Sequence, residues 1–387
     1  MTLPRRRLTM VWDDRFNEYD LGPTHPFRME YRGLAAHLVD AVHGTAPSGE
    51  FVRVRSVDPS TRAELARFHT PDYLEMVDRA GADDFAPPLD KGDTPAFPGC
   101  FPAAARIVAG TLTALAAARS GPGGRAMNPS GGLHHAHPDR ASGFCVFNDV
   151  AVALRSALNG SSPVRRVAYI DIDAHHGDGV MYGFYRDGRV LDIDVHQDGR
   201  TIFPGTGRLD ETGEGDGEGL KVNVPLPPGA GDEAVVPLIE SIVPEMVRAF
   251  RPELVVLQHG MDAHAGDRLA QLQYTPWAYA RILRTVLDLA DEVAGGRLVI
   301  TGGGGYLAEN VALGLARAAL TTRGRTSWDS APPEAWRREF HATVGRAAPR
   351  TFVPETPTGP TPWSPERTDE RLDELGRVLG RRFPSPG

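Results

Sequence analysis

Short apolar runs alternate with longer amphipathic stretches along most of this chain. Runs that are apolar at successive positions and rich in β-branched residues are typical of strands buried on both faces, whereas amphipathic stretches are typical of helices. The predicted strands are Leu8–Trp12, Phe51–Val57, Val167–Ile172, Val190–Val195, Leu254–Gln258 and Leu298–Thr301. The predicted helices are Leu34–Val42, Phe101–Ala118, Val150–Leu158, Asp232–Phe250 and Trp277–Val293. This alternation predicts an α/β fold in which helices cover both faces of an open parallel β-sheet, with the active site at the carboxyl ends of the strands.

The chain is expected to form one domain followed by a tail. Residues 1–350 show no shift in composition that would mark a linker. Residues 351–387 differ, because their first half is rich in Pro and Thr and has no apolar periodicity. We expect this segment to be an extended tail with a short charged helix over Glu366–Arg381.

The composition is that of a globular protein despite many turn-forming residues. The 387 residues include 43 Gly and 33 Pro, but 41% are hydrophobic and 24% are charged, which excludes a disordered or collagen-like chain. A net charge of −8 argues against a nucleic-acid-binding protein. We find no signal-peptide pattern and no run of about 20 apolar residues, so we expect a soluble cytoplasmic protein outside the membrane.

Histidines, rather than cysteines, mark the expected site. The chain has only 2 Cys, so a metal site would use His and carboxylate ligands. Of the 13 His, eight fall between residues 134 and 264, most of them close to Gly or Asp at the ends of predicted strands: His134, His135, His137, His175, His176, His196, His259 and His264. Ligand sites of parallel α/β sheets open at those ends, so the clustering predicts one site assembled from several loops.

A metal site is predicted at the end of one strand, in the segment 169–179. Because side chains alternate along a strand, Asp171, Asp173 and His175 would project to one side. Burying two neighbouring carboxylates costs several kcal/mol unless a cation or donors neutralise them. A further ligand is expected from the segment 254–267, where Asp262, His264 and Asp267 are all suitable; spacing alone does not choose among these three.

Two further motifs contain residues suited to an active site. His134 and His135 lie in a Gly-bounded loop, and paired imidazoles beside carboxylates suit proton transfer. Four glycines, Gly302–Gly305, precede Tyr306 and allow a close approach of the backbone. A phosphate-binding loop is a weaker interpretation of these glycines, because the Lys and Ser/Thr of a P-loop are missing.

Taken together, these motifs resemble the histone deacetylase family of the arginase and deacetylase superfamily, and in particular the bacterial acetoin-utilisation deacetylases. The resemblance covers about residues 8–325. It rests on six ordered segments: Tyr19–Pro26, Gly131–Asp149, Asp171–Gly179, Phe203–Gly207, Leu257–Asp267 and Gly302–Tyr306. It implies a metal-dependent hydrolase that removes acetyl groups from lysine side chains of proteins and releases acetate.

The resemblance implies a set of metal ligands. These are Asp173, His175 and Asp267, while Asp262 and His264 would stay near the site without binding metal. Zn²⁺ is the expected ion, and Fe²⁺ suits two carboxylates and one imidazole as well. A structural K⁺ or Na⁺ is also expected from the family.

The resemblance also implies the catalytic roles. His135 would be the general base and acid, supported by Asp178, and His134 would be an electrostatic partner supported by Asp171. Tyr306 would donate a hydrogen bond to the substrate carbonyl.

Four residues would form the acyl-lysine channel by the same resemblance. Phe144 and Phe203 would be its walls, Gly143 part of its floor, and Asp93 the rim residue that holds the substrate backbone.

Several positions depart from the family pattern. Tyr31 stands where many relatives carry an Arg at the floor of the pocket, and the adjacent Arg32 is expected to point elsewhere. Tyr274 stands where many relatives have Leu or Met beside the channel, which predicts a narrower or more polar entrance. Asp194 replaces a common Ser near the expected monovalent cation.

Three other functions compete with protein deacetylation. Deacetylation of acetylpolyamines or other small amides would use the same machinery with a different rim. A catalytically inactive acyl-lysine-binding regulator is disfavoured, because all expected ligand and proton-transfer residues are present, and an arginase-like ureohydrolase would need a binuclear site. The expected partner is an acetylated protein, for which the resemblance suggests an acyl-CoA synthetase; the oligomeric state is not predicted.

Overall fold

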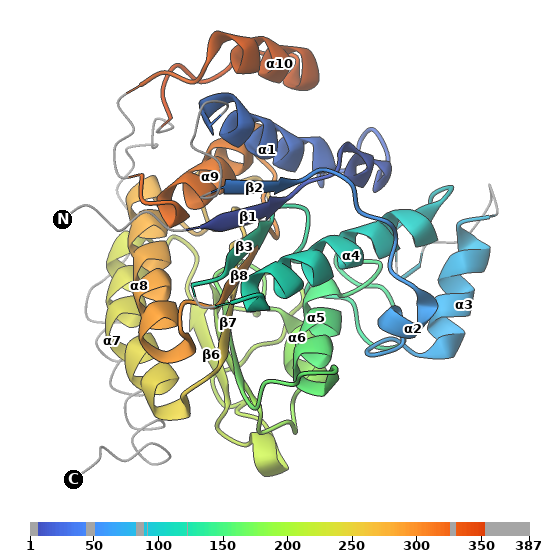
Figure 1. Cartoon of the computed structure of the whole chain (residues 1–387), viewed down its shortest axis with the longest axis vertical. Helices are drawn as coiled ribbons and strands as arrows, with labels where there is room; N and C mark the ends of the chain where they lie inside the picture. The colour runs from blue at the N-terminus through green and yellow to red at the C-terminus, as the bar shows by residue number, and fades with distance from the viewer. Residues whose placement is uncertain are drawn as a thin grey trace.

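Parallel strands form one eight-stranded sheet through the centre of the computed structural model (Figure 1). In chain order they are β1 (Leu8–Val11), β2 (Phe51–Val54), β3 (Arg125–Asn128), β4 (Val167–Asp171), β5 (Val190–Gln197), β6 (Lys221–Leu226), β7 (Leu254–Gln258) and β8 (Leu298–Thr301). Their order across the sheet is β2-β1-β3-β8-β7-β4-β5-β6. The structure describes residues 7–43, 51–82, 89–90, 92–121, 123–325 and 330–352, so nearly all of the expected tail and its terminal helix lie outside the described residues.

Helices cover both faces of this sheet (Figure 1). One face carries α4 (Cys100–Arg119), α5 (Asp149–Asn159) and α6 (Asp178–Gly183), with α2 (Arg62–Leu65) and α3 (Pro71–Ala80) beyond them. The other carries α7 (Asp232–Phe250), α8 (Pro276–Ala294) and α9 (Ala308–Thr322), with α1 (Met29–His43) packed on α9 and α10 (Glu334–Val344) on α1. The predicted α/β fold is therefore confirmed.

Two strands, β3 and β6, are not among the predicted strands, because polar residues interrupt their hydrophobic pattern. Arg125 begins β3, is 2% exposed and pairs with Asp291 at 2.5 Å. Lys221 begins β6, and its Nζ donates to Val190 O at 2.8 Å. The predicted strand beyond Val54 is shorter than expected, because the Val57 amide donates to Asp13 Oδ2 instead of to a neighbouring strand.

The α4 helix is strongly apolar and packs in the protein core. It is the one helix in the described part of the chain with the length and hydropathy to cross a membrane, and 61% of its most apolar window is buried in the fold. It packs against α5, β1 and β3. A buried core helix has the same length and hydropathy as a membrane span, so this helix is only weak evidence for one.

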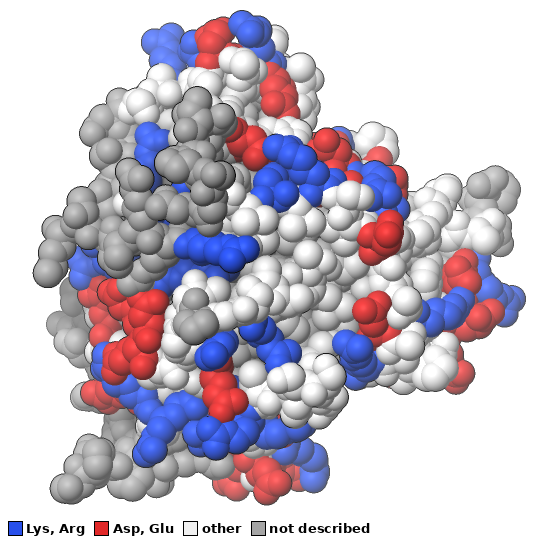
Figure 2. Space-filling model, viewed as in Figure 1, with Lys and Arg blue, Asp and Glu red and all other residues white. Residues whose placement is uncertain are grey.

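Surface charges of both signs are interspersed on the face shown in Figure 2. Elsewhere in the structure they form exposed ion pairs such as Arg248 with Glu292 at 2.8 Å and Arg281 with Glu240 at 2.5 Å. Such pairs contribute little to stability. The mixture agrees with the moderate net charge of −8.

The strand order brings distant loops together at one edge. Because β3, β8, β7, β4 and β5 are neighbours and parallel, the segments that follow them all leave from the carboxyl ends of adjacent strands. These segments contain the histidine pair, the Gly302–Gly305 run and both groups of acidic residues.

Candidate active site

Two adjacent histidines lie at the centre of this edge, in the loop after β3. His134 Nδ1 lies 2.8 Å from Asp171 Oδ2, and His135 Nδ1 lies 2.8 Å from Asp178 Oδ1. Their Nε2 atoms are 3.1 Å apart. Asp178 Oδ2 also lies 3.0 Å from His137 Nε2, so His137 belongs to the same network. Each imidazole therefore has its own carboxylate, as expected from the sequence.

The environments of the two histidines separate their charge states. Burial opposes the charged form of His134, but the charges of Asp171 and Asp173 raise its pKa to about 10. Burial and the charge of His134 lower the pKa of His135 to about 4, against the opposing effect of Asp178. A positively charged His134 beside a neutral His135 provides a proton acceptor and an electrostatic neighbour in one pair.

The loop that carries the histidines is held by two residues at the start of α5. Asn148 Nδ2 donates to His134 O at 3.0 Å, and Asp149 Oδ1 accepts from the Leu133 amide at 2.7 Å. Asp149 Oδ2 also accepts from the Gly132 amide at 3.0 Å and from Thr111 Oγ1 at 2.5 Å. The side chain is fully buried, so these bonds have no water to replace them.

Replacing Asp149 with Ala is expected to destabilise the fold by about 2–4 kcal/mol, because each buried donor left unpaired costs about 1–3 kcal/mol. The midpoint of urea unfolding measures the change. Thr111→Val is the matched control, since it removes one partner of Asp149 and leaves both amide bonds intact. Equal midpoints for Asp149→Ala and Thr111→Val would contradict this role.

A second group of acidic and imidazole side chains lies beside the histidine pair. Asp173, His175 and Asp262 are buried, and one potential ligand atom from each lies within 4.8 Å of the other two. His175 Nδ1 is 3.4 Å from Asp173 Oδ1 and 2.8 Å from Asp262 Oδ2. Burial and the charge of Asp173 raise the pKa of Asp262 to about 8. Two buried carboxyl groups this close favour a cation between them.

Glycines allow these carboxylates to lie directly against the backbone. A Cβ atom at Gly260 would lie 2.1 Å from Asp173 Oδ2, and one at Gly304 would lie 2.0 Å from Asp262 Oδ2. The Gly304 amide donates to Asp173 Oδ2 at 2.7 Å. The glycine run after β8 therefore forms one wall of the acidic group, as its sequence indicates.

The two acidic residues of the loop after β7 that the sequence offers as ligands both lie at this edge: Asp262 belongs to the acidic group, and Asp267, which the resemblance names as a ligand, stays a predicted ligand. Asp267 Oδ1 accepts from the Leu269 amide at 2.9 Å, and its Oδ2 accepts from the Tyr306 amide at 2.9 Å. Both of its oxygens are thus engaged by the backbone. Asp267 fixes the position of Tyr306, and His264 lies outside the acidic group, as expected.

Tyr306 faces the group from the glycine run. Its side chain is 6% exposed, and its ring packs edge-on against His175 at 6.3 Å and against Phe144 at 6.0 Å. The structure therefore brings Tyr306 together with the residues that the sequence assigns to metal binding and proton transfer.

Arg32 lies at the floor of the site, contrary to the sequence expectation. The guanidinium is fully buried, stacks on Phe27 at 4.1 Å, and donates from Nη2 to Gly303 O. Its position in the first turns of α1 directs it toward the glycine run, whereas the neighbouring Tyr31 is half-buried against the core. Arg32, and not Tyr31, therefore reaches the glycine run.

Aromatic side chains surround a small cavity above these groups. The cavity has a volume of about 20 Å³, and its lining includes Gly143, Phe144, His135, Asp173 and Tyr306. Gly143 has φ +54°, and a Cβ atom there would lie 2.5 Å from His135 Cδ2 and 2.8 Å from Phe203 Cε1. Phe203 is 41% exposed and packs edge-on against His135 at 5.1 Å. The expected channel residues therefore lie around one opening.

Of two other expected residues, Tyr274 has a different position from the one predicted, whereas Asp194 pairs in register with Asp171 as expected. Tyr274 is fully buried and packs against Tyr279 at 6.0 Å, outside the lining of the cavity, so it does not narrow the entrance. Asp194 accepts from His196 Nδ1 at 2.7 Å and from the Gly177 amide at 2.8 Å. The monovalent cation near Asp194 stays a prediction.

Asp93 is exposed and connects to the channel wall. Thr94 Oγ1 donates to Asp93 Oδ1 at 3.1 Å and accepts from the Phe144 amide at 3.0 Å. Partial burial and the neighbouring Asp90 carboxyl raise the pKa of Asp93 to about 6. Burial alone would raise the pKa of Asp90, but hydrogen bonds from Asp93 and Thr94 outweigh this effect and lower the pKa of Asp90 to about 2.

The pKa of Asp93 leads to a pH prediction. Above pH 6 its charged carboxylate can accept backbone N–H groups of a substrate with both oxygens, and below pH 6 the protonated group loses its charge and one of these acceptors. We expect KM for a peptide substrate to rise as the pH falls from about 7 to about 5. Asp93→Asn should have a raised KM at both pH values, and the ratio of variant to unmodified KM should shrink as the pH falls. A ratio that does not change with pH would refute this role.

Sequence reasoning missed the role of Arg32. The hydrophobic pattern of α1 contains a signal for Arg32, because a basic residue at a buried helix position needs a polar partner.

Comparison with known proteins agrees with this geometry. A family model described as the histone deacetylase domain matches residues 25–322. The chain therefore belongs to the histone deacetylase family, and it is a lysine deacetylase by that membership.

Individual relatives cover nearly all of the chain. It is 34% identical over 384 residues to the acetoin utilization protein AcuC of Bacillus subtilis, a match that covers 97% of each chain. It is 30% identical to AcuC of Staphylococcus xylosus, over 92% of this chain and 90% of that protein. It is 34% identical to histone deacetylase clr6 of Schizosaccharomyces pombe, over 81% of this chain and 76% of that protein.

Proposed function

We propose that this protein is a metal-dependent hydrolase that removes acetyl groups from lysine side chains of proteins and releases acetate. One observation carries the proposal: the histidine pair, with a separate carboxylate behind each ring, lies beside the group Asp173, His175 and Asp262 at the base of an aromatic opening. Amide hydrolysis needs a proton acceptor, a means of polarising the carbonyl and a narrow path for the acyl chain. These residues supply all three.

The donor set fits a divalent transition metal. Asp173, His175 and Asp267 would hold the ion with two carboxylates and one imidazole, a combination that suits Zn²⁺ and also Fe²⁺. Asp262 lies beside Asp173 and His175 in the acidic group. When bound, such an ion lowers the pKa of a coordinated water toward about 7 and polarises a carbonyl oxygen. A structural K⁺ or Na⁺ near Asp171 and Asp194 belongs to the same proposal.

His135 acts as the general base and acid. Its Nε2 faces the second histidine and the cavity, while Asp178 holds Nδ1 and so fixes the tautomer. His135 accepts a proton as water attacks the amide carbon. It then delivers a proton to the lysine nitrogen as the C–N bond breaks, which gives acetate and a free amine.

Two other side chains stabilise the negative charge that develops on the carbonyl oxygen. Tyr306 donates from its hydroxyl to the carbonyl oxygen, and charged His134 stabilises the negative charge that forms beside it. Phe144 and Phe203 exclude water around the aliphatic part of the lysine, and Asp93 holds the peptide backbone at the rim. The proposed protein substrate is an acetylated acyl-CoA synthetase in the cytoplasm.

The test is acetate release from an acetyl-lysine peptide and from an acetylpolyamine, each with and without a chelator. We expect chelator-sensitive release from the peptide. Preferential release from the acetylpolyamine would favour the small-molecule alternative. Failure on both substrates by metal-loaded protein would contradict the proposed activity.

A further inference from the structure

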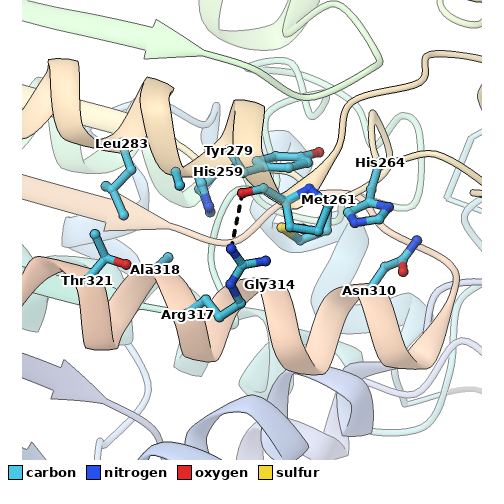
Figure 3. A pocket seen from close by; sticks show the side chains of 12 residues that line it. His259, Met261, His264, Tyr279, Leu283, Asn310, Gly314, Arg317, Ala318 and Thr321 are labelled. Carbon is cyan, nitrogen blue, oxygen red and sulfur yellow. Dashed lines mark hydrogen bonds between the residues drawn. The ribbon is translucent and has the colours of Figure 1, made fainter. Parts of the chain in front are cut away.

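A second cavity lies behind the loop that follows β7, between α8 and α9 (Figure 3). Its volume is about 20 Å³, which exceeds the space that one water molecule requires. Its polar lining is formed by His259, His264, Asn310 and Arg317, and Met261 and Leu283 form much of its apolar lining. None of its lining residues lines the channel cavity, so the two cavities are separate.

Two buried imidazole nitrogens of this cavity have no hydrogen-bond partner in the described part of the chain. His264 Nδ1 lies 3.0 Å from Ala265 O, which leaves its Nε2 without a partner, and His259 Nδ1 also has none. The two rings are 2% and 1% exposed and pack against Tyr279 at 5.9 and 5.3 Å. Buried polar groups in proteins are nearly always satisfied, so these nitrogens point to an occupant of the cavity.

The charge of the lining indicates the kind of occupant. Arg317 on α9 donates from Nη2 to Pro276 O at 3.1 Å, a bond drawn as the dashed line in Figure 3, and this bond holds the guanidinium at the cavity. No Asp or Glu is among the lining residues of this cavity within the described chain. A planar guanidinium pairs in a forked geometry with carboxylates. The apolar side formed by Met261 and Leu283 suits a short alkyl group.

We propose that this cavity binds a small aliphatic carboxylate of about the size of acetate. The carboxylate would pair with Arg317 and accept from His259, and the methyl group would lie against Met261 and Leu283. The same loop directs Asp262 to the opposite side, into the acidic group. The site is therefore distinct from the catalytic cavity and does not depend on the proposed reaction.

Calorimetric titration of the purified, metal-loaded protein with sodium acetate tests the proposal. Arg317→Leu removes the cation, and Ala280→Leu fills the half-buried cavity mouth on α8 while keeping all charges. Arg284→Leu is the matched control, because this exposed Arg on α8 lies outside the cavity lining. Circular dichroism and the midpoint of thermal unfolding confirm that each variant is folded.

We expect saturable acetate binding that both cavity variants weaken at least about tenfold and that Arg284→Leu leaves unchanged. Chloride at equal concentration should compete poorly with acetate. The proposal is overturned if the unmodified protein shows no saturable binding, if either cavity variant binds as the unmodified protein does, or if chloride competes equally. A protein that fails to deacetylate any peptide would still show this binding, so the two proposals fail separately.

Discussion

Tyr306→Phe should lower kcat by about 10²–10³-fold, because it removes one preorganised donor to the developing oxyanion. The bound metal should be retained, since the Tyr306 hydroxyl is not among the ligand atoms of the acidic group. Steady-state kinetics with an acetyl-lysine peptide and metal analysis of the same preparation measure the two effects.

Tyr274→Phe is the control for this experiment. It removes a buried hydroxyl that has no hydrogen-bond partner among the described residues, and Tyr274 lies outside the channel lining. We expect unchanged kcat in this variant. A Tyr306→Phe enzyme with normal turnover would exclude the donor role of Tyr306.

Asp267→Asn should remove the metal and the activity together. Loss of one of three protein ligands weakens binding more than the roughly 10–100-fold that is typical for residues behind the ligands. The metal content after dialysis and the activity after adding Zn²⁺ or Fe²⁺ measure the change.

Asp262→Asn is the matched substitution earlier in the same loop. It should retain the metal, because the resemblance places Asp262 near the site without binding the ion. The opposite pattern, with metal lost from Asp262→Asn and kept by Asp267→Asn, would identify Asp262 as the ligand.

Much of the fold could be predicted from the sequence, because buried parallel strands are apolar at nearly every position. The strands β4, β7 and β8 show this pattern over most of their length. The strands β3 and β6 could not be recognised, since Arg125 and Lys221 are buried against partners far away in the sequence, Asp291 and the Val190 carbonyl.

The candidate site, like the fold, could be predicted from the sequence only in part. Asp171 is the last residue of β4, and Asp173 and His175 follow it at alternate positions, so their grouping could be predicted from the local sequence. Asp262 and Asp267 lie in an irregular loop, where the direction of a side chain depends on tertiary contacts such as those of Asp267 with Tyr306. The position of Arg32 likewise depends on the packing of α1 against the glycine run.

The close fit of Gly260 and Gly304 against the acidic group limits how this site can vary. Because a single added carbon at either position would overlap a carboxylate, the backbone there is as much a part of the site as the three side chains. Grafting Asp173, His175 and Asp262 onto another α/β scaffold would therefore fail unless the backbone segments that contain Gly260 and Gly304 were transferred with them. A library that randomises these two positions should return only glycine among active clones.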